Sequence, residues 1–147
     1  MSGVCPAALG GLTQTLTGPF FFLSLSPVSD TFFTRVTLLT EKTPALVALA
    51  RQCRHKCVEG TVDEEEAELW VTDVFTPHLS LVYSSMPAEK VKAEVLHKVS
   101  KSVDDAGVVT GPSAAGAELG GWKGGRVALV QTWGELDQWK VIAERVL

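Results

Sequence analysis

Residues 76–83 read Thr-Pro-His-Leu-Ser-Leu-Val-Tyr. Polar and apolar side chains alternate along this stretch, and that period of two is typical of a half-buried β-strand. Pro77 stands at the first position of the strand, where a missing N–H group costs least. Because residues i and i+2 of a strand point to the same face, His78 and Ser80 project together while the two leucines beside them pack on the other face.

Working outward from this strand, the pattern predicts further strands in pairs and helices singly. That arrangement favours an α+β fold with a largely antiparallel sheet and two helices. The first two strands are expected to form a hairpin. The expected strands are 20–28, 32–40, 78–84, 126–133 and 139–146, and the expected helices are 44–59 and 87–103.

Local signals support the two helices. Thr43 is a suitable N-cap, and Pro44 fits the first helical position. In the second helix, valines recur every four residues from Val91 to Val103. The acidic run at residues 63–68 predicts a loop or a helix start, since consecutive glutamates point in different directions and are poorly placed to share a metal ion.

Length and composition restrict the function classes. The chain has 147 residues, 46% hydrophobic residues and a net charge of −4. This size suits one domain, predicted at residues 20–147 after a poorly defined segment at 1–19. The acidic balance argues against binding to long nucleic acid but leaves room for a small nucleotide. The apolar run at residues 20–25 is too short to span a membrane, and no membrane span is expected.

The three cysteines are Cys5, Cys53 and Cys57. An odd number suggests a reducing compartment. Cys53 and Cys57 are one helical turn apart, as zinc ligands can be, but a zinc site would need two further ligands. The preferred interpretation is that both are small apolar residues on the inner face of a helix, and no metal or other cofactor is expected.

The chemistry of the strand at 78–84 rests on one histidine and one hydroxyl. An imidazole titrates near neutral pH and can give or take a proton. A hydroxyl can donate to a phosphate oxygen on which charge develops. A His-x-Ser pair is a weak signal alone. His55 and His97 are expected on helices and lack this pattern, so they are interpreted as surface or helix-flank residues.

Three segments carry a resemblance to a known family. FTPHLSLVYSSMPAEKV at 75–91 resembles the second motif region of cyclic phosphodiesterases of the two-histidine phosphoesterase family. TFFTRVTLLTEKTPALVALA at 31–50 is similar to the strand and helix that precede this motif there. GWKGGRVALVQTWGELDQWKVIAERVL at 121–147 resembles the closing hairpin. The ordered agreement of the three segments makes the resemblance specific, and together it covers about residues 20–147.

The resemblance implies a bilobal α+β fold in which two His-x-Ser/Thr motifs face each other across a cleft. One histidine activates water, the other protonates the leaving oxygen, and no metal is required. The implied substrates are nucleoside 2',3'-cyclic phosphates, opened by fungal members to 2'-phosphates, and ADP-ribose 1'',2''-cyclic phosphate from tRNA splicing. The location stays open between the cytoplasm and the Golgi, and the resemblance to fungal members implies only the Golgi.

The resemblance makes His78 and Ser80 the candidate catalytic residues. Tyr83 is a candidate substrate-binding residue, although alternation points it to the opposite face unless a bulge intervenes. Lys123 and Arg126 approach the closing hairpin and are the nearest candidate cations for a phosphate, with solvated surface charge as the alternative.

The sequence departs from the family in its first motif. Thr-Gln-Thr-Leu-Thr at residues 13–17 echoes the expected His-x-Thr-Leu-Thr, with threonine in place of histidine and the wrong spacing to the next strand. The interpretation is a missing N-terminal lobe, with residues 1–19 unrelated to it. Two readings stay open: a cyclic phosphodiesterase with one surviving half-site, and a noncatalytic nucleotide- or protein-binding module built on the same half-fold.

Overall fold

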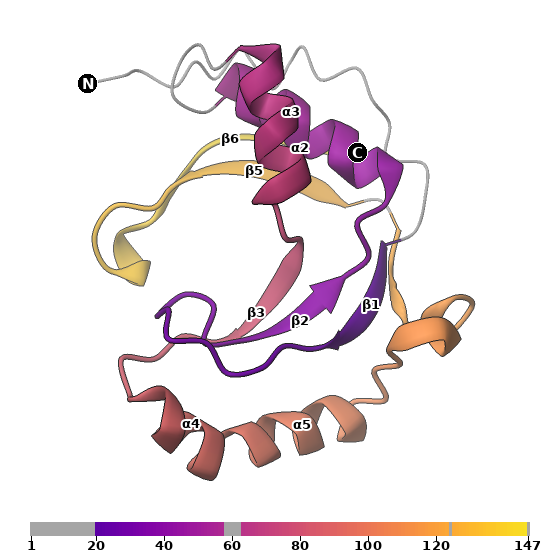
Figure 1. The fold of residues 1–147 in the computed structure, drawn as a ribbon, viewed down its shortest axis with the longest axis vertical. Coiled ribbons are helices and arrows are strands. Elements are labelled where there is room, and N and C mark those ends of the chain that lie inside the picture. Colours follow the sequence, from indigo (N-terminus) through magenta and orange to yellow (C-terminus); the bar gives the residue numbers. More distant parts are fainter. Residues whose placement is uncertain (1–19, 58–62, 124, 147) are drawn as a thin grey trace. The chain divides into compact units, whose positions relative to one another are not determined.

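The computed structural model describes residues 20–57, 63–123 and 125–146 (Figure 1). It has the predicted α+β class. The predictions for residues 1–19, including Cys5, lie outside the described residues. The elements are β1 (Phe20–Leu25), β2 (Val36–Thr40), α2 (Pro44–Cys57), α3 (Glu64–Asp73), β3 (His78–Val82), α4 (Ala88–Glu94), α5 (Leu96–Asp105), η1 (Gly111–Ala114), β4 (Gly121–Trp122), β5 (Arg126–Gln131), η2 (Leu136–Gln138) and β6 (Lys140–Val146).

The described chain divides into two compact units. The sheet unit comprises residues 20–42 and 76–122, and the hairpin unit comprises residues 43–57, 63–75, 123 and 125–146. The sheet unit holds β1 to β4 together with α4 and α5. The hairpin unit holds the helix pair α2 and α3 and the strand pair β5 and β6.

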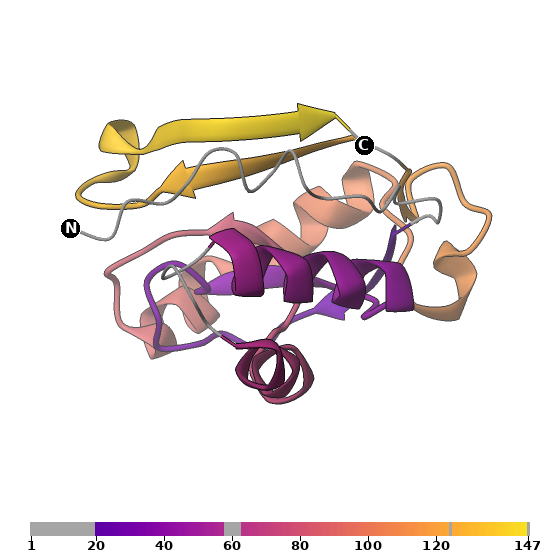
Figure 2. The same ribbon diagram turned by 90° about the horizontal axis from the view of Figure 1, so that it is seen from above.

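The four strands of the sheet unit form one antiparallel sheet in the order β3-β2-β1-β4. The predicted hairpin of the first two strands is confirmed. The expectation that the last two strands join the same sheet is wrong, because β5 and β6 pair only with each other in a separate two-stranded sheet (Figure 2). Alternation gives each strand its faces, but it does not specify the partner strand. Here the short strand β4 pairs with the edge of β1.

The register divides the sheet into two faces. We call one the reactive face and the other the packing face. In antiparallel pairs, residues opposite each other share a face. The reactive face carries Ser24, Thr37, Leu39, His78 and Ser80. The packing face carries Phe22, Leu25, Leu38, Thr40 and Leu79.

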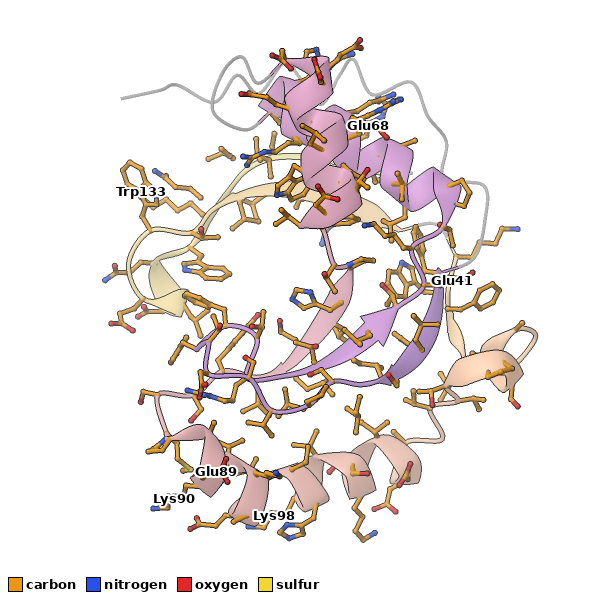
Figure 3. The ribbon with its side chains drawn as sticks, in the orientation of Figure 1. Glu41, Glu68, Glu89, Lys90, Lys98 and Trp133 are labelled. Carbon is orange, nitrogen blue, oxygen red and sulfur yellow. The ribbon has the colours of Figure 1, made fainter. Side chains whose placement is uncertain are left out.

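Helix α5 lies against the packing face. An apolar groove of about 480 Å³ runs between them, and Leu38, Leu79 and Val103 are among its lining residues. Leu38 is 2% exposed, and Val91 on α4 is fully buried. On the outer side of α4, Lys90 projects away from the sheet (Figure 3). These apolar contacts form the core of the sheet unit, and burial of apolar surface is the main stabilising term for such a core.

The helices differ from the prediction in number. The acidic run proves to be the start of helix α3, whose N-cap Asp63 accepts a hydrogen bond from the Glu66 N–H at 2.8 Å. Glutamates in a first turn also favour the helix dipole. The single helix predicted at 87–103 divides into α4 and α5 at Val95, where φ is −115°. A β-branched residue is a weak helix former and suits such a junction.

Candidate functional site

His78 and Ser80 lie on the same face of β3, as the sequence predicted. The register sets His78 opposite Leu39 and Ser80 opposite Thr37 on the central strand β2. His78 is exposed and Ser80 is half-buried. Because β3 pairs along its length with β2, the backbone of both residues is fixed by the sheet, which holds side chains more precisely than a loop does.

The ring of His78 is oriented by the backbone just before the strand. Its Nδ1 atom lies 2.7 Å from the carbonyl oxygen of Thr76. A carbonyl oxygen only accepts hydrogen bonds, so Nδ1 carries the proton in this contact, and in the neutral form of such a ring Nε2 is the acceptor. The next carbonyl, that of Pro77, accepts from the Thr40 N–H at 3.1 Å and ties this segment to β2. The geometry therefore orients the ring and directs its Nδ1 atom to the backbone, away from the side where Nε2 lies.

The Ser80 hydroxyl is available to a ligand. Within the part of the chain that the structure describes, its oxygen makes no hydrogen bond to another protein group. A half-buried hydroxyl without a protein partner can donate to an incoming anionic oxygen. His78 and Ser80 thus place a proton acceptor and a hydrogen-bond donor side by side on a rigid strand.

A β-bulge changes the position expected for Tyr83. Val36 pairs with Val82, whereas the next residue of β2, Thr37, pairs with Ser80, so Leu81 is an extra residue in β3. A bulge of this kind reverses the alternation beyond it. The paired residues end at Val82, which the bulge moves to the side of Leu38 and Leu79. Alternation continued by one residue would bring Tyr83 to the side of His78 and Ser80, so its part in substrate binding stays a prediction.

Lys123 and Arg126 belong to the hairpin unit, whereas His78, Ser80 and Tyr83 belong to the sheet unit. Arg126 forms an ion pair with Glu144 across β5 and β6, with a nitrogen–oxygen distance of 3.2 Å. This pair is largely exposed, and such pairs contribute little to stability. Lys123 is exposed. Their part in phosphate binding stays a prediction.

The two cysteines of α2 are free thiols. Burial raises the pKa of the Cys53 thiol to about 11, and the neighbouring Cys57 adds to the shift. Burial also raises the pKa of Cys57. Metal ligands and nucleophiles need the thiolate, which these environments disfavour. Among the described residues, no group of three or more His, Cys, Asp or Glu side chains is arranged to hold a metal ion.

The sequence reading missed the polar surroundings of the pair. Thr37, 4% exposed, stands opposite Ser80, and Ser24 lies on the same face of β1. Both could have been found by extending the alternation through 20–28 and 32–40 with one bulge in each strand pair, but no sequence signal marks those bulges. His97 lies exposed on α5, and His55 is half-buried on α2. No described helix is long and apolar enough to cross a membrane.

Comparison with known proteins identifies a family. The family described as "Cyclic phosphodiesterase-like protein" matches residues 4–147, a span that also includes residues 4–19. A protein of Phaeosphaeria nodorum named 2',3'-cyclic-nucleotide 3'-phosphodiesterase is 42% identical over 119 residues, covering 80% of this chain and 58% of its own length. Proteins of the same name from Neurospora crassa and Yarrowia lipolytica are each 32% identical.

The Neurospora match covers 80% of this chain and 57% of that relative, and the Yarrowia match covers 85% and 66%. The chain thus spans between half and two thirds of the length of these curated relatives. No solved structure matches the chain.

Proposed function

Because the chain belongs to the cyclic phosphodiesterase-like family, we propose that it carries one half of a hydrolytic site for nucleoside 2',3'-cyclic phosphates. His78 is the proton-transfer residue, and Ser80 donates a hydrogen bond to the phosphate. The observation that carries this proposal is the hydrogen bond from His78 Nδ1 to the Thr76 carbonyl, which leaves Nε2 free beside the Ser80 hydroxyl.

The reaction consumes one water molecule. Its oxygen bonds to phosphorus while the bond from phosphorus to O3' breaks, so the phosphate stays on O2' and O3' gains a proton. One group must take a proton from the water and another must give one to O3'. His78, with its Nε2 lone pair, can perform either transfer, but one imidazole cannot readily perform both in the same step. A second acid–base group is therefore part of the proposal.

Phosphate binding needs donors in addition to Ser80. Tyr83, one residue beyond β3, is a candidate that supplies a hydroxyl and an aromatic face. Lys123 and Arg126 are the candidate cations, with surface charge as their alternative role. The substrate is a small cyclic phosphate rather than long nucleic acid, which the net charge of −4 supports. The proton transfers require no metal, because imidazoles and hydroxyls can carry them.

The test is a steady-state assay of adenosine 2',3'-cyclic phosphate in the presence of EDTA. We expect the 147-residue chain to turn over very slowly or not at all. A version extended upstream to include a second His-x-Thr/Ser motif should be active and should release adenosine 2'-phosphate. Robust turnover by the short chain would show that a second histidine motif is not needed. Release of the 3'-phosphate would contradict the proposed bond cleavage.

The second candidate is a noncatalytic module that binds the same ligands. The single His-x-Ser motif in the 147 residues favours it. It predicts that the extended version binds adenosine 2',3'-cyclic phosphate, measured by isothermal titration calorimetry, without any turnover that depends on His78. The enzyme proposal predicts both binding and turnover, so the two measurements together separate the readings.

A further inference from the structure

A nearly buried hydroxyl stands directly across from the candidate phosphate donor. Thr37 on the central strand β2 pairs with Ser80 on β3, and the register puts both side chains on the reactive face. Thr37 is 4% exposed. Side chains opposite each other in an antiparallel pair have Cβ atoms about 4.5–5.5 Å apart. The two hydroxyls therefore border the same small region of the reactive face, close enough to act on one bound group.

The backbone of Thr37 is held from both sides. Its carbonyl oxygen accepts from the Ser26 N–H at 2.8 Å, and its N–H donates to the Ser26 hydroxyl oxygen at 3.0 Å. Nearby on the chain, Arg35 is 5% exposed, and its Nε and Nη2 atoms donate to the Ser84 carbonyl oxygen at 3.2 and 3.0 Å. These contacts tie this part of β2 to the chain that follows β1 and to the chain that follows β3. Both polar backbone groups of Thr37 are satisfied, and only its hydroxyl is left.

The Thr37 hydroxyl has no protein partner in the part of the chain that the structure describes. Facing hydroxyls on neighbouring strands can bond to each other, but within the described residues no such bond joins Thr37 to Ser80. The hydroxyl oxygen of Thr40, on the other face of β2, is fully enclosed, whereas that of Thr37 is not. A nearly buried hydroxyl without a partner costs stability. A ligand that accepts a hydrogen bond from Thr37 accounts for its position.

The cross-strand pairs show where the donors of the reactive face lie. His78 stands opposite Leu39, which has no polar side-chain atom, whereas Ser80 stands opposite Thr37. Residues i and i+2 of a strand are about 7 Å apart. The imidazole is thus at one end of the site and two hydroxyls are at the other. A phosphate between them can turn its nonbridging oxygens to the hydroxyls and the oxygen that exchanges a proton to the imidazole.

We propose that the Thr37 hydroxyl is a second donor to the nonbridging phosphate oxygens and acts as a pair with Ser80. This inference rests on the proposed function, because it takes the cyclic phosphate as the ligand. When water adds to phosphorus, negative charge grows on the nonbridging oxygens, and donors already fixed in place stabilise that charge. Thr37 donates a hydrogen bond and exchanges no proton with the substrate. The hydroxyl pair also orients the phosphate relative to His78.

The experiment removes the hydroxyl without removing volume. Thr37→Val replaces the hydroxyl with a methyl group, Thr37→Ser keeps it, and the matched control Thr40→Val removes a hydroxyl from the packing face of the same strand. Titration of the 147-residue chain, followed by phosphorus NMR, gives the affinity for three ligands. They are adenosine 2',3'-cyclic phosphate and its two phosphorothioate diastereomers, each with sulfur in place of one nonbridging oxygen. Sulfur accepts hydrogen bonds weakly.

Thr37→Val should weaken binding of adenosine 2',3'-cyclic phosphate about tenfold, the lower end for loss of one hydrogen bond to a charged group. It should weaken one phosphorothioate similarly and leave the other nearly unchanged, because that diastereomer already lacks the acceptor that Thr37 uses. Thr37→Ser should keep most of the affinity, and Thr40→Val should change none of the three. Equal weakening of all three ligands, or no weakening of the oxygen ligand, would overturn the second donor.

Turnover by the active extended version separates this inference from the proposed function. If Ser80→Ala lowers kcat/KM and Thr37→Val does not, the proposed function stands and the second donor fails. If Thr37→Val weakens binding as described while His78→Ala leaves turnover intact, the second donor stands and the proposed proton transfer fails. Failure of the parent chain to bind any of the three ligands would overturn the second donor in this chain, while turnover by the extended version would still decide the proposed function.

Discussion

Strands β1, β2 and β3 contribute residues to both faces of the four-stranded sheet, but the two faces carry different side chains. The packing face presents Leu38, which is 2% exposed, to the core, and Leu79, which is 49% exposed, lines the groove beside α5. The reactive face presents His78 and Ser80 together with Thr37. One set of strands thus carries buried apolar residues on one side and the candidate catalytic pair on the other, because successive side chains of a strand alternate.

Because the two faces differ, we expect substitutions on the reactive face to change activity and substitutions on the packing face to change the free energy of unfolding. Substitution of His78 on the reactive face removes an exposed polar group, so few packing contacts are lost with it. A substitution on the packing face removes buried apolar volume and leaves the site residues in place. The predictions that follow test this separation.

The largest effect is expected from His78→Ala in the active extended version. Turnover of adenosine 2',3'-cyclic phosphate should fall by at least about a hundredfold, the lower end of what one general acid–base group contributes. The urea midpoint should stay close to that of the parent, since the imidazole is exposed. Steady-state kinetics and urea denaturation measure the two quantities.

The matched control is His97→Ala, which removes an exposed histidine from α5 in the same unit. It should change neither turnover nor stability. Full activity of His78→Ala would remove His78 from the mechanism, and an equal loss in His97→Ala would point to a nonspecific effect of losing a histidine.

The opposite outcome is expected from Leu38→Ala on the packing face. Leu38 is 2% exposed, and truncation of a buried leucine costs about 2–5 kcal/mol of unfolding free energy. Under conditions where the variant is folded, kcat should be near that of the parent. Leu23→Ala, at an exposed bulge residue (44%), should cost less than about 0.5 kcal/mol. A loss of kcat in folded Leu38→Ala would show that the faces are coupled.

Much of this separation could be predicted from the sequence. The alternation in residues 78–82 correctly gave a strand with His78 and Ser80 on one face. Thr43 and Pro44 correctly marked a helix start, and the Thr43 hydroxyl does accept from the Leu46 N–H at 3.3 Å. These features are local, so propensity and period suffice to predict them.

The remainder depends on contacts between distant segments. The bulge at Leu81, which moves Val82 to the packing face, depends on the pairing of β3 with β2 and has no local signal. No local pattern marks Arg35, because its hydrogen bonds to the Ser84 carbonyl cross 49 residues of sequence. The pairing of β5 with β6 in a separate sheet likewise could not be predicted, because alternation shows which face a residue is on but not which strand pairs with which.

A smaller effect is expected from Ser80→Ala on the reactive face. Loss of one hydrogen bond to a charged group costs about 1.5–3 kcal/mol, and other donors to the phosphate remain, so about a tenfold fall in kcat/KM is expected. Ser24→Ala, on the same face of β1, should leave kcat/KM unchanged. If Ser24→Ala lost as much as Ser80→Ala, the whole face rather than the His78–Ser80 pair would hold the phosphate.

The smallest effect, with reversed sign, is expected from Thr40→Val on the packing face. Thr40 is 4% exposed, and among the residues that the structure describes its hydroxyl oxygen has no hydrogen-bond partner. A buried unpaired hydroxyl costs about 1–3 kcal/mol, so replacing it with a methyl group should raise the unfolding free energy, by about 1 kcal/mol. The same substitution at Thr43, whose hydroxyl caps α2, should lower it by about 0.5–2 kcal/mol. Urea denaturation of both variants decides the matter: destabilisation by Thr40→Val would mean that the hydroxyl has a partner, and that the packing face carries a polar contact of its own.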